Sequence, residues 1–170
     1  MKRQTSLLML SIRASILILS SGIGSLPAAP VAPVTIQFVN PAKFTDFEFR
    51  RRDANYTASL FAGNVKDELT PLMRQKYPHG SLLLRFTDID LAGRYSSARG
   101  VRVMTVGHPA RMSFDFLLTG ANGKVLAKGS TRLTDNSNPS SGRYDPKRSQ
   151  LFYYERRTLN RWLRTLSTSR

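Results

Sequence analysis

Two aspartates separated by a single residue, Asp88 and Asp90, are the side chains best placed to do chemistry. In an extended strand they would share one face with their Cα atoms about 7 Å apart, because each residue advances the strand by roughly 3.3 Å. A carboxylate pair of this kind can bind a hard divalent cation or divide acid and base roles. Asp46 is a candidate third ligand. One hypothesis is therefore a metal-assisted hydrolase that uses Asp46, Asp88 and Asp90, with the cation on Asp88 and Asp90.

The same aspartates also have a purely structural interpretation. Capping of a turn, or ion pairs with Arg94, Arg99 or Arg102, would account for them, and a D-x-D pattern arises often by chance. The chain has no cysteine, which excludes disulfides and catalytic thiols, and it lacks the usual nucleotide-binding, zincin and hydrolase signatures. We favour the structural interpretation, assign no catalytic residue and predict no cofactor, with a divalent cation as the alternative.

Arginines form a second group of candidate binding residues. Three stand in succession, and three recur at i, i+4 and i+7, which places them on one face of a helix. They are Arg50, Arg51, Arg52, Arg157, Arg161 and Arg164. The chain carries 26 Lys and Arg against 11 Asp and Glu, a net charge of +15. Because guanidinium groups hold phosphates and carboxylates well, these arginines are candidate ligands of an anionic partner. A solvated basic surface with no specific anion site is the alternative.

The N-terminal segment predicts export. Residues 1–28 combine a basic start, an apolar run over residues 7–19 and small residues near the end, which is typical of a signal peptide. The apolar run is shorter than the roughly 18–20 residues that cross a bilayer, and it contains Arg13. We therefore expect no transmembrane span in the mature protein, with an uncleaved signal anchor as the alternative.

The mature part is expected to form one domain. Residues 29–33 are rich in proline and alanine and predict an extended linker, and residues 34–170 are of the size of a single α+β domain. Removal of the signal peptide takes away Lys2, Arg3 and Arg13, which leaves 23 basic residues against 11 acidic ones and a net charge of +12.

Export decides which anionic partners to expect. In the periplasm these are phosphates of lipopolysaccharide, acidic phospholipid headgroups or another envelope protein, and we expect no nucleic acid. We therefore predict a periplasmic, non-enzymatic binding or envelope-accessory domain with a basic surface. The metal-assisted hydrolase is the alternative. A structural subunit of a larger assembly is a third hypothesis, and an exposed apolar patch would be its sign.

Hydrophobic periodicity predicts the elements that position these residues. In chain order they are a strand over 34–39, a helix over 54–77 with Pro71 inside it, a strand over 81–91, a loop-like segment over 93–107, two strands over 112–119 and 124–134, and a helix over 149–166. A short strand through Val101, Val103 and Val106 is the alternative within the loop-like segment. The apolar positions change phase between Phe86 and Ile89, which predicts a β-bulge that turns Asp88 and Asp90 outward. Pro71 is expected to kink its helix or to begin a second short one. The order predicts an α+β fold: a single sheet of about four strands, with an antiparallel hairpin in its second half and two helices packed on one face.

Several short blocks of this sequence occur together in one known family. They are Phe44-Thr45-Asp46, Asp88-Ile89-Asp90-Leu91-Ala92-Gly93, Arg102-Val103-Met104, Leu133-Thr134-Asp135, and Tyr154-Glu155 followed by Leu159 and Trp162. The set resembles domain of unknown function 3016, an uncharacterised family of exported proteobacterial proteins, over most of residues 34–166. The resemblance implies a periplasmic location and supplies no activity.

Overall fold

The computed structural model describes residues 33–49, 52–105, 107–135, 137 and 150–167. The predicted signal peptide, most of the predicted linker, Arg50 and Arg51 lie outside the described residues. The elements are β1 (Val34–Phe38), the 3-10 turn η1 (Pro41–Lys43), α1 (Ala54–Lys76), β2 (Ser81–Asp90), β3 (Arg94–Ser96), β4 (Val101–Val103), β5 (Arg111–Thr119), β6 (Val125–Thr134) and α2 (Tyr153–Thr165).

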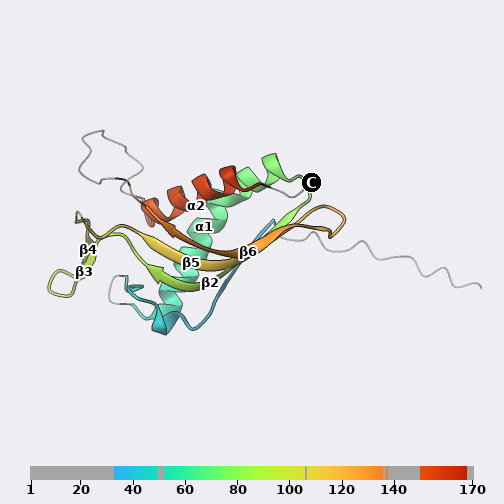
Figure 1. Cartoon of the computed structure of the whole chain (residues 1–170). Coiled ribbons are helices and arrows are strands. Elements are labelled where there is room, and N and C mark those ends of the chain that lie inside the picture. The colour runs from blue at the N-terminus through green and yellow to red at the C-terminus, as the bar shows by residue number, and fades with distance from the viewer. Residues whose placement is uncertain (1–32, 50–51, 106, 136, 138–149, 168–170) are drawn as a thin grey trace, which may run out of the picture. The chain divides into compact units, whose positions relative to one another are not determined.

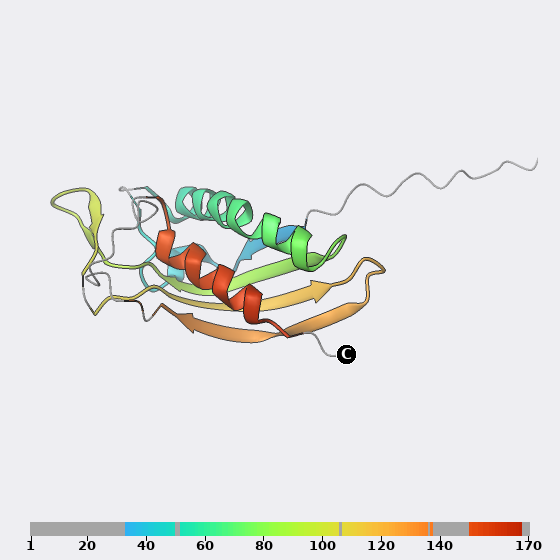
Figure 2. The same cartoon turned by 90° about the horizontal axis from the view of Figure 1, so that it is seen from above.

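A four-stranded mixed sheet in the order β1-β2-β5-β6 forms one layer, and the two helices form the other (Figures 1 and 2). β1 runs parallel to β2, as expected when a helix connects two strands, and the other neighbours are antiparallel. Phe61 of α1 packs on Phe86, and Trp162 of α2 packs on Phe114, whose side chains lie on one face of the sheet. The predicted α+β class, with both helices on one face, is confirmed.

Aromatic side chains fill the space between the layers. Phe61 is fully buried, and its ring centroid lies 5.4 Å from that of Phe86 and 5.2 Å from that of Phe152, with the rings edge to face. Burial of a phenylalanine side chain contributes roughly 1.5–3 kcal/mol, and edge-to-face pairs add to this. The core therefore needs no disulfide.

α1 has a capped start and runs without interruption to its end. The side chain of Asp53 accepts a hydrogen bond from the backbone N–H of Tyr56 (2.8 Å), which satisfies one of the free donors of the first turn. Pro71 lies inside a single helix of 23 residues that continues to Lys76. The alternative of a second short helix starting at Pro71 is therefore wrong.

α2 begins at Tyr153, four residues later than the sequence predicts. Phe152 adopts a left-handed backbone conformation with φ of 53° and cannot be part of the helix. In this conformation the ring centroid of Phe152 lies 5.3 Å from that of Phe49 and 5.2 Å from that of Phe61. The aromatic core thus determines where the helix starts.

The bulge in β2 is confirmed. The pairing of β2 with β5 changes register between Phe86 and Asp88, so that Ile89 takes the buried position that strict alternation would assign to Asp88 or Asp90. Beyond the end of β2, the segment predicted to be loop-like contains a small antiparallel hairpin, β3–β4. This hairpin positions Arg102 in the site described below.

Candidate functional site

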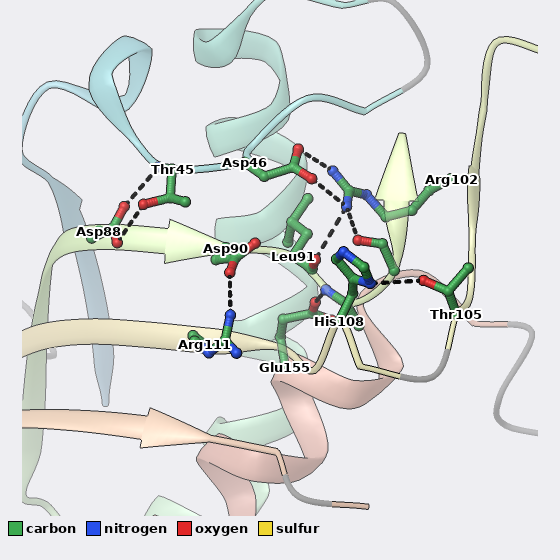
Figure 3. A network of polar contacts seen from close by, with 12 residues as sticks. Thr45, Asp46, Asp88, Asp90, Leu91, Arg102, Thr105, His108, Arg111 and Glu155 are labelled. Atoms are coloured by element: carbon green, nitrogen blue, oxygen red, sulfur yellow. Dashed lines mark hydrogen bonds and ion pairs between the residues drawn. The ribbon is translucent and has the colours of Figure 1, made fainter. Parts of the chain in front are cut away.

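Residues from four of the blocks singled out in the sequence come together at the end of β2, among them Asp46, Asp90, Arg102 and Glu155 (Figure 3). The loop after η1 runs beside this end: the N–H of Asp46 donates to the carbonyl of Ile89 (3.3 Å), and the N–H of Leu91 donates to the carbonyl of Asp46 (2.9 Å). Asp46 and Asp90 thereby form an isolated parallel bridge. The three candidate aspartates are thus neighbours in space, as the hydrolase hypothesis expects, and their partners decide what they can do.

Arg102 ties this end of the sheet together. Its Nη2 lies 2.6 Å from Asp46 Oδ1 and its Nη1 lies 3.0 Å from Asp46 Oδ2, which is the bidentate geometry of a strong pair. The same guanidinium donates to the carbonyls of Leu91, Gly93 and Glu48 at 3.0–3.1 Å. Only 6% of the Arg102 side chain is exposed. Arg102 is therefore a structural clamp that holds the loop around Asp46 against the chain that leaves β2.

Gly93 is required where this chain turns. Its φ is +77°, a conformation that favours glycine, and a Cβ atom there would lie 2.3 Å from the carbonyl oxygen of Val103. The close approach brings β4 near enough for Arg102 to reach the Gly93 carbonyl. The glycine of the D-x-D-L-A-G block thus has a backbone role.

Each of the two remaining aspartates also has its own partner. Asp88 accepts hydrogen bonds from the backbone N–H of Thr45 (2.8 Å) and from its hydroxyl (2.9 Å). Asp90 forms an ion pair with Arg111 at 3.0 Å. The sequence suggested Arg94, Arg99 or Arg102 as partners of Asp88 and Asp90, and in the structure Arg102 pairs with Asp46 instead.

These pairings bear on the hydrolase hypothesis. Among the residues that the structure describes, no three His, Cys, Asp or Glu side chains lie close enough to hold a metal ion. A carboxylate already bound to arginine or threonine is also a poor general base, since its lone pairs are occupied. The geometry of Asp46, Asp88 and Asp90 favours the structural interpretation.

Glu155 is a buried carboxyl group that belongs to one of the sequence blocks but that the sequence analysis did not select as a site residue. It lies on α2, is 3% exposed, and its Oε1 accepts a hydrogen bond from the N–H of Ala92 (2.7 Å). Burial raises the pKa of Glu155 above 4.5, while the bond from Ala92 and the charge of Arg102 act in the opposite direction. Glu155 links α2 to the segment that Arg102 clamps. Apart from the block that contains it, Glu155 has no local signal in the sequence, because its partner is 63 residues away.

Asp135 is the second acid that fixes α2. It is 1% exposed and accepts two hydrogen bonds from Arg157 Nη2, both at 3.1 Å. Burial acts to lower the pKa of Arg157, but the charge of Asp135 and its hydrogen bonds raise it above the usual value. Arg157, predicted as an anion ligand, is therefore already paired with a carboxylate inside the protein.

Arginines of α2 line a pocket of about 460 Å³ that we call the arginine pocket. Its residues are Glu68, Gln150, Tyr153, Arg156, Arg157, Asn160, Arg161 and Arg164. Glu68 is the one acid in this set: it accepts a hydrogen bond from Asn160 (2.7 Å) and lies 3.6 Å from Arg156. Arg161 and Arg164 are exposed. The structure thus places the three predicted arginines of this helix in one pocket and adds Arg156, which sequence spacing did not select.

The other predicted arginine group has a different setting. Arg52 is exposed, and its guanidinium carbon lies 5.3 Å from the centre of the Tyr56 ring. Arg52 is not among the residues that line the arginine pocket. The site residues that can be placed therefore divide into the clamped end of the sheet, the arginine pocket and Arg52.

The fold and the site define an α+β domain whose sheet end is clamped by an arginine and whose second helix carries an arginine-lined pocket. Residues 32–165 match the family described as a protein of unknown function, DUF3016, and the chain belongs to this family. No curated protein and no solved structure matches the chain. Within the described residues, no helix combines the length and the apolar character needed to cross a bilayer.

Proposed function

We propose that this chain is a periplasmic accessory domain without an enzymatic activity of its own, and that it binds an anionic component of the envelope through the arginines of α2. The observation that carries the proposal is the arginine pocket, which four guanidinium groups line. Arg156 faces Glu68 and Arg157 is paired with Asp135, so the charge left for a ligand is that of Arg161 and Arg164. Arg161 and Arg164 are exposed and, within the described part of the chain, neither forms an ion pair. They are available to an external anion.

The chemistry of the pocket favours phosphate. A guanidinium is planar, always charged and able to donate two parallel hydrogen bonds to one phosphate group. Asn160 supports this geometry, because its side-chain oxygen accepts a hydrogen bond from Arg164 Nε (2.7 Å) while its nitrogen donates to Glu68. The signal-peptide pattern of residues 1–28 supports an envelope location, where phosphates are carried by lipid headgroups.

Vesicle binding across a salt series tests the proposal. The full chain is mixed with vesicles of phosphatidylcholine alone or of phosphatidylcholine with phosphatidylglycerol, and bound protein is measured by co-sedimentation. We expect binding to the anionic vesicles to exceed binding to the neutral ones and to weaken with salt, because the Debye length falls from about 10 Å at 0.1 M to about 3 Å at 1 M. Equal, salt-insensitive binding to both vesicles contradicts the proposal.

A pair of charge-matched variants assigns the effect to α2. Arg161→Gln with Arg164→Gln removes two charges from the arginine pocket. Each cation near an anionic surface contributes about 1 kcal/mol, so we expect about 30-fold weaker binding. Lys128→Gln with Arg132→Gln removes the same charge from exposed positions of β6, and we expect a much smaller loss. All variants keep the same N-terminal segment, so its own contribution to vesicle binding cancels.

A further inference from the structure

A second pocket adjoins the arginine pocket at the start of α2. Its volume is about 300 Å³, and most of its wall is apolar. We call it the apolar pocket; its main residues are Phe49, Leu91, Val101, Met104, Leu151 and Phe152. Gln150 and Tyr153 line both pockets. The two pockets therefore meet along a shared wall.

Two apolar side chains at the mouth of the apolar pocket are unusually exposed, which indicates a binding site. Val101 is 48% exposed and Met104 is 45% exposed, and these are two of the five large apolar side chains that are exposed in the described part of the chain. Both belong to the β3–β4 hairpin or the residue just after it. Exposed apolar side chains that gather at the mouth of an apolar pocket are typical of a binding site, since each contributes more when a ligand covers it.

The two pockets differ in charge. Both residues of the shared wall contact arginines of the arginine pocket. Gln150 accepts a hydrogen bond from Arg156 (2.8 Å), and the guanidinium carbon of Arg157 lies 5.3 Å from the centre of the Tyr153 ring. Glu155 and Arg102 also line the apolar pocket, but the guanidinium of Arg102 is engaged by Asp46 (Figure 3). The cations that are free to meet an anionic group therefore lie in the arginine pocket and not in the apolar pocket.

We infer that the two pockets form one site for a phosphate-bearing lipid, with the phosphate on the arginines of α2 and one alkyl chain in the apolar pocket. The inference rests on the proposed function and names its ligand class. It explains why an apolar pocket and a cationic pocket share a wall. A free phosphate ion would use the arginine pocket alone, and an uncharged lipid would use the apolar pocket alone.

A chain-length series of soluble ligands tests this inference. Binding of inorganic phosphate and of butyl, hexyl, octyl and decyl phosphate is measured by calorimetry below the concentrations at which they form micelles, with decyl maltoside as the uncharged ligand. Each added methylene that enters an apolar site contributes about 0.8 kcal/mol, which is an affinity gain of about fourfold. We expect this gain along the series until the pocket is full, and much weaker binding of decyl maltoside.

Glutamine substitutions in each pocket separate the contributions of the two halves of the site. Val101→Gln with Met104→Gln should abolish the dependence on chain length and leave inorganic phosphate binding unchanged. Arg161→Gln with Arg164→Gln should weaken every alkyl phosphate and keep the dependence on chain length. Val125→Gln is the control, because Val125 is 47% exposed on β6 and lines neither pocket.

Two results would overturn the inference, and they differ in what they say of the proposed function. Equal affinity for inorganic, butyl and decyl phosphate removes the alkyl-chain site while phosphate binding by α2 stands. Equal affinity for decyl phosphate and decyl maltoside removes the phosphate from the site, and with unchanged binding by the Arg161→Gln, Arg164→Gln variant it also contradicts the proposed function. Circular dichroism of each variant checks that it is folded.

Discussion

At the scale of the residue, the D-x-D-L-A-G block is explained by structure. Asp88 holds Thr45, Asp90 holds Arg111, and Gly93 allows the turn that brings the hairpin close. Arg102 joins these parts, because one guanidinium reaches a carboxylate and three backbone carbonyls. A block that suggests metal chemistry in the sequence therefore acts as a junction in the fold.

Arg102→Met tests this junction. It removes the buried member of a partly buried ion pair and leaves Asp46 and three carbonyls without their donor, so we expect a loss of about 3 kcal/mol in the free energy of unfolding. Urea denaturation measures the loss. Arg94→Met is the control, because Arg94 is exposed on the neighbouring strand β3, and we expect a change of less than about 0.5 kcal/mol there. Equal stabilities of the two variants would contradict the role of Arg102.

Glu155 predicts a specific dependence of stability on pH. Burial raises its pKa in the folded protein above the unfolded value of 4.5, so the folded state holds the proton more tightly. The resulting contribution to stability is fully present below pH 4.5 and is lost as the pH rises through the folded-state pKa. The wild type should therefore lose stability relative to Glu155→Gln as the pH rises above 4.5.

Urea denaturation of both proteins over a pH series measures this difference. The other ionisable groups are common to both proteins, so their direct contributions cancel. Two outcomes would contradict a raised folded-state pKa of Glu155. The difference in unfolding free energy between the two proteins could stay constant across the series, or it could change in favour of the wild type as the pH rises.

At the scale of the element, α2 is held at several points along its length. Glu155 binds Ala92 near its first turn, Arg157 binds Asp135, and Lys76 of α1 closes its other end. Lys76 Nζ donates to the carbonyls of Leu163 (3.0 Å), Arg164 (2.7 Å) and Leu166 (3.0 Å). A cation at the C-terminal end of a helix satisfies its free carbonyls and its dipole. The helix that carries the arginine pocket is thereby fixed to the rest of the domain.

Lys76→Met tests the contact between the helices. The loss of a cation from the end of α2 and of its hydrogen bonds should lower the free energy of unfolding by about 1–2 kcal/mol. Hydrogen exchange should show faster opening at the last turn of α2. Lys66→Met, at an exposed position of the same helix α1, is the matched control and should change neither. Similar effects of the two substitutions would mean that the charge of α1 matters and the cap does not.

At the scale of the whole molecule, local patterns predict most of the architecture. Alternation in β2 and its change of phase indicate both the strand and the bulge, because a core position tolerates no unpaired carboxylate. The start of α2 is not predictable in this way, since it depends on the packing of Phe152 against Phe49 and Phe61.

The candidate site is less predictable, because its partners are distant in sequence. Arg102 is 56 residues from Asp46, Glu155 is 63 from Ala92, and no spacing rule relates them. The i, i+4, i+7 arginines of α2 are found because helical spacing is local. Their division into Arg157, which is paired with a buried acid, and the exposed Arg161 and Arg164 needs the tertiary structure.

The most direct test of the proposed anion site is a map of where an anion binds. Amide and arginine side-chain resonances of the full chain are followed by NMR as glycerol phosphate, the soluble part of an anionic lipid headgroup, is added against a chloride control. We predict shifts that saturate and that are confined to α2, largest at Arg161 and Arg164, with none at Lys128 and Arg132 on β6. Shifts spread evenly over the exposed cations of both elements, or confined to β6, would contradict the account.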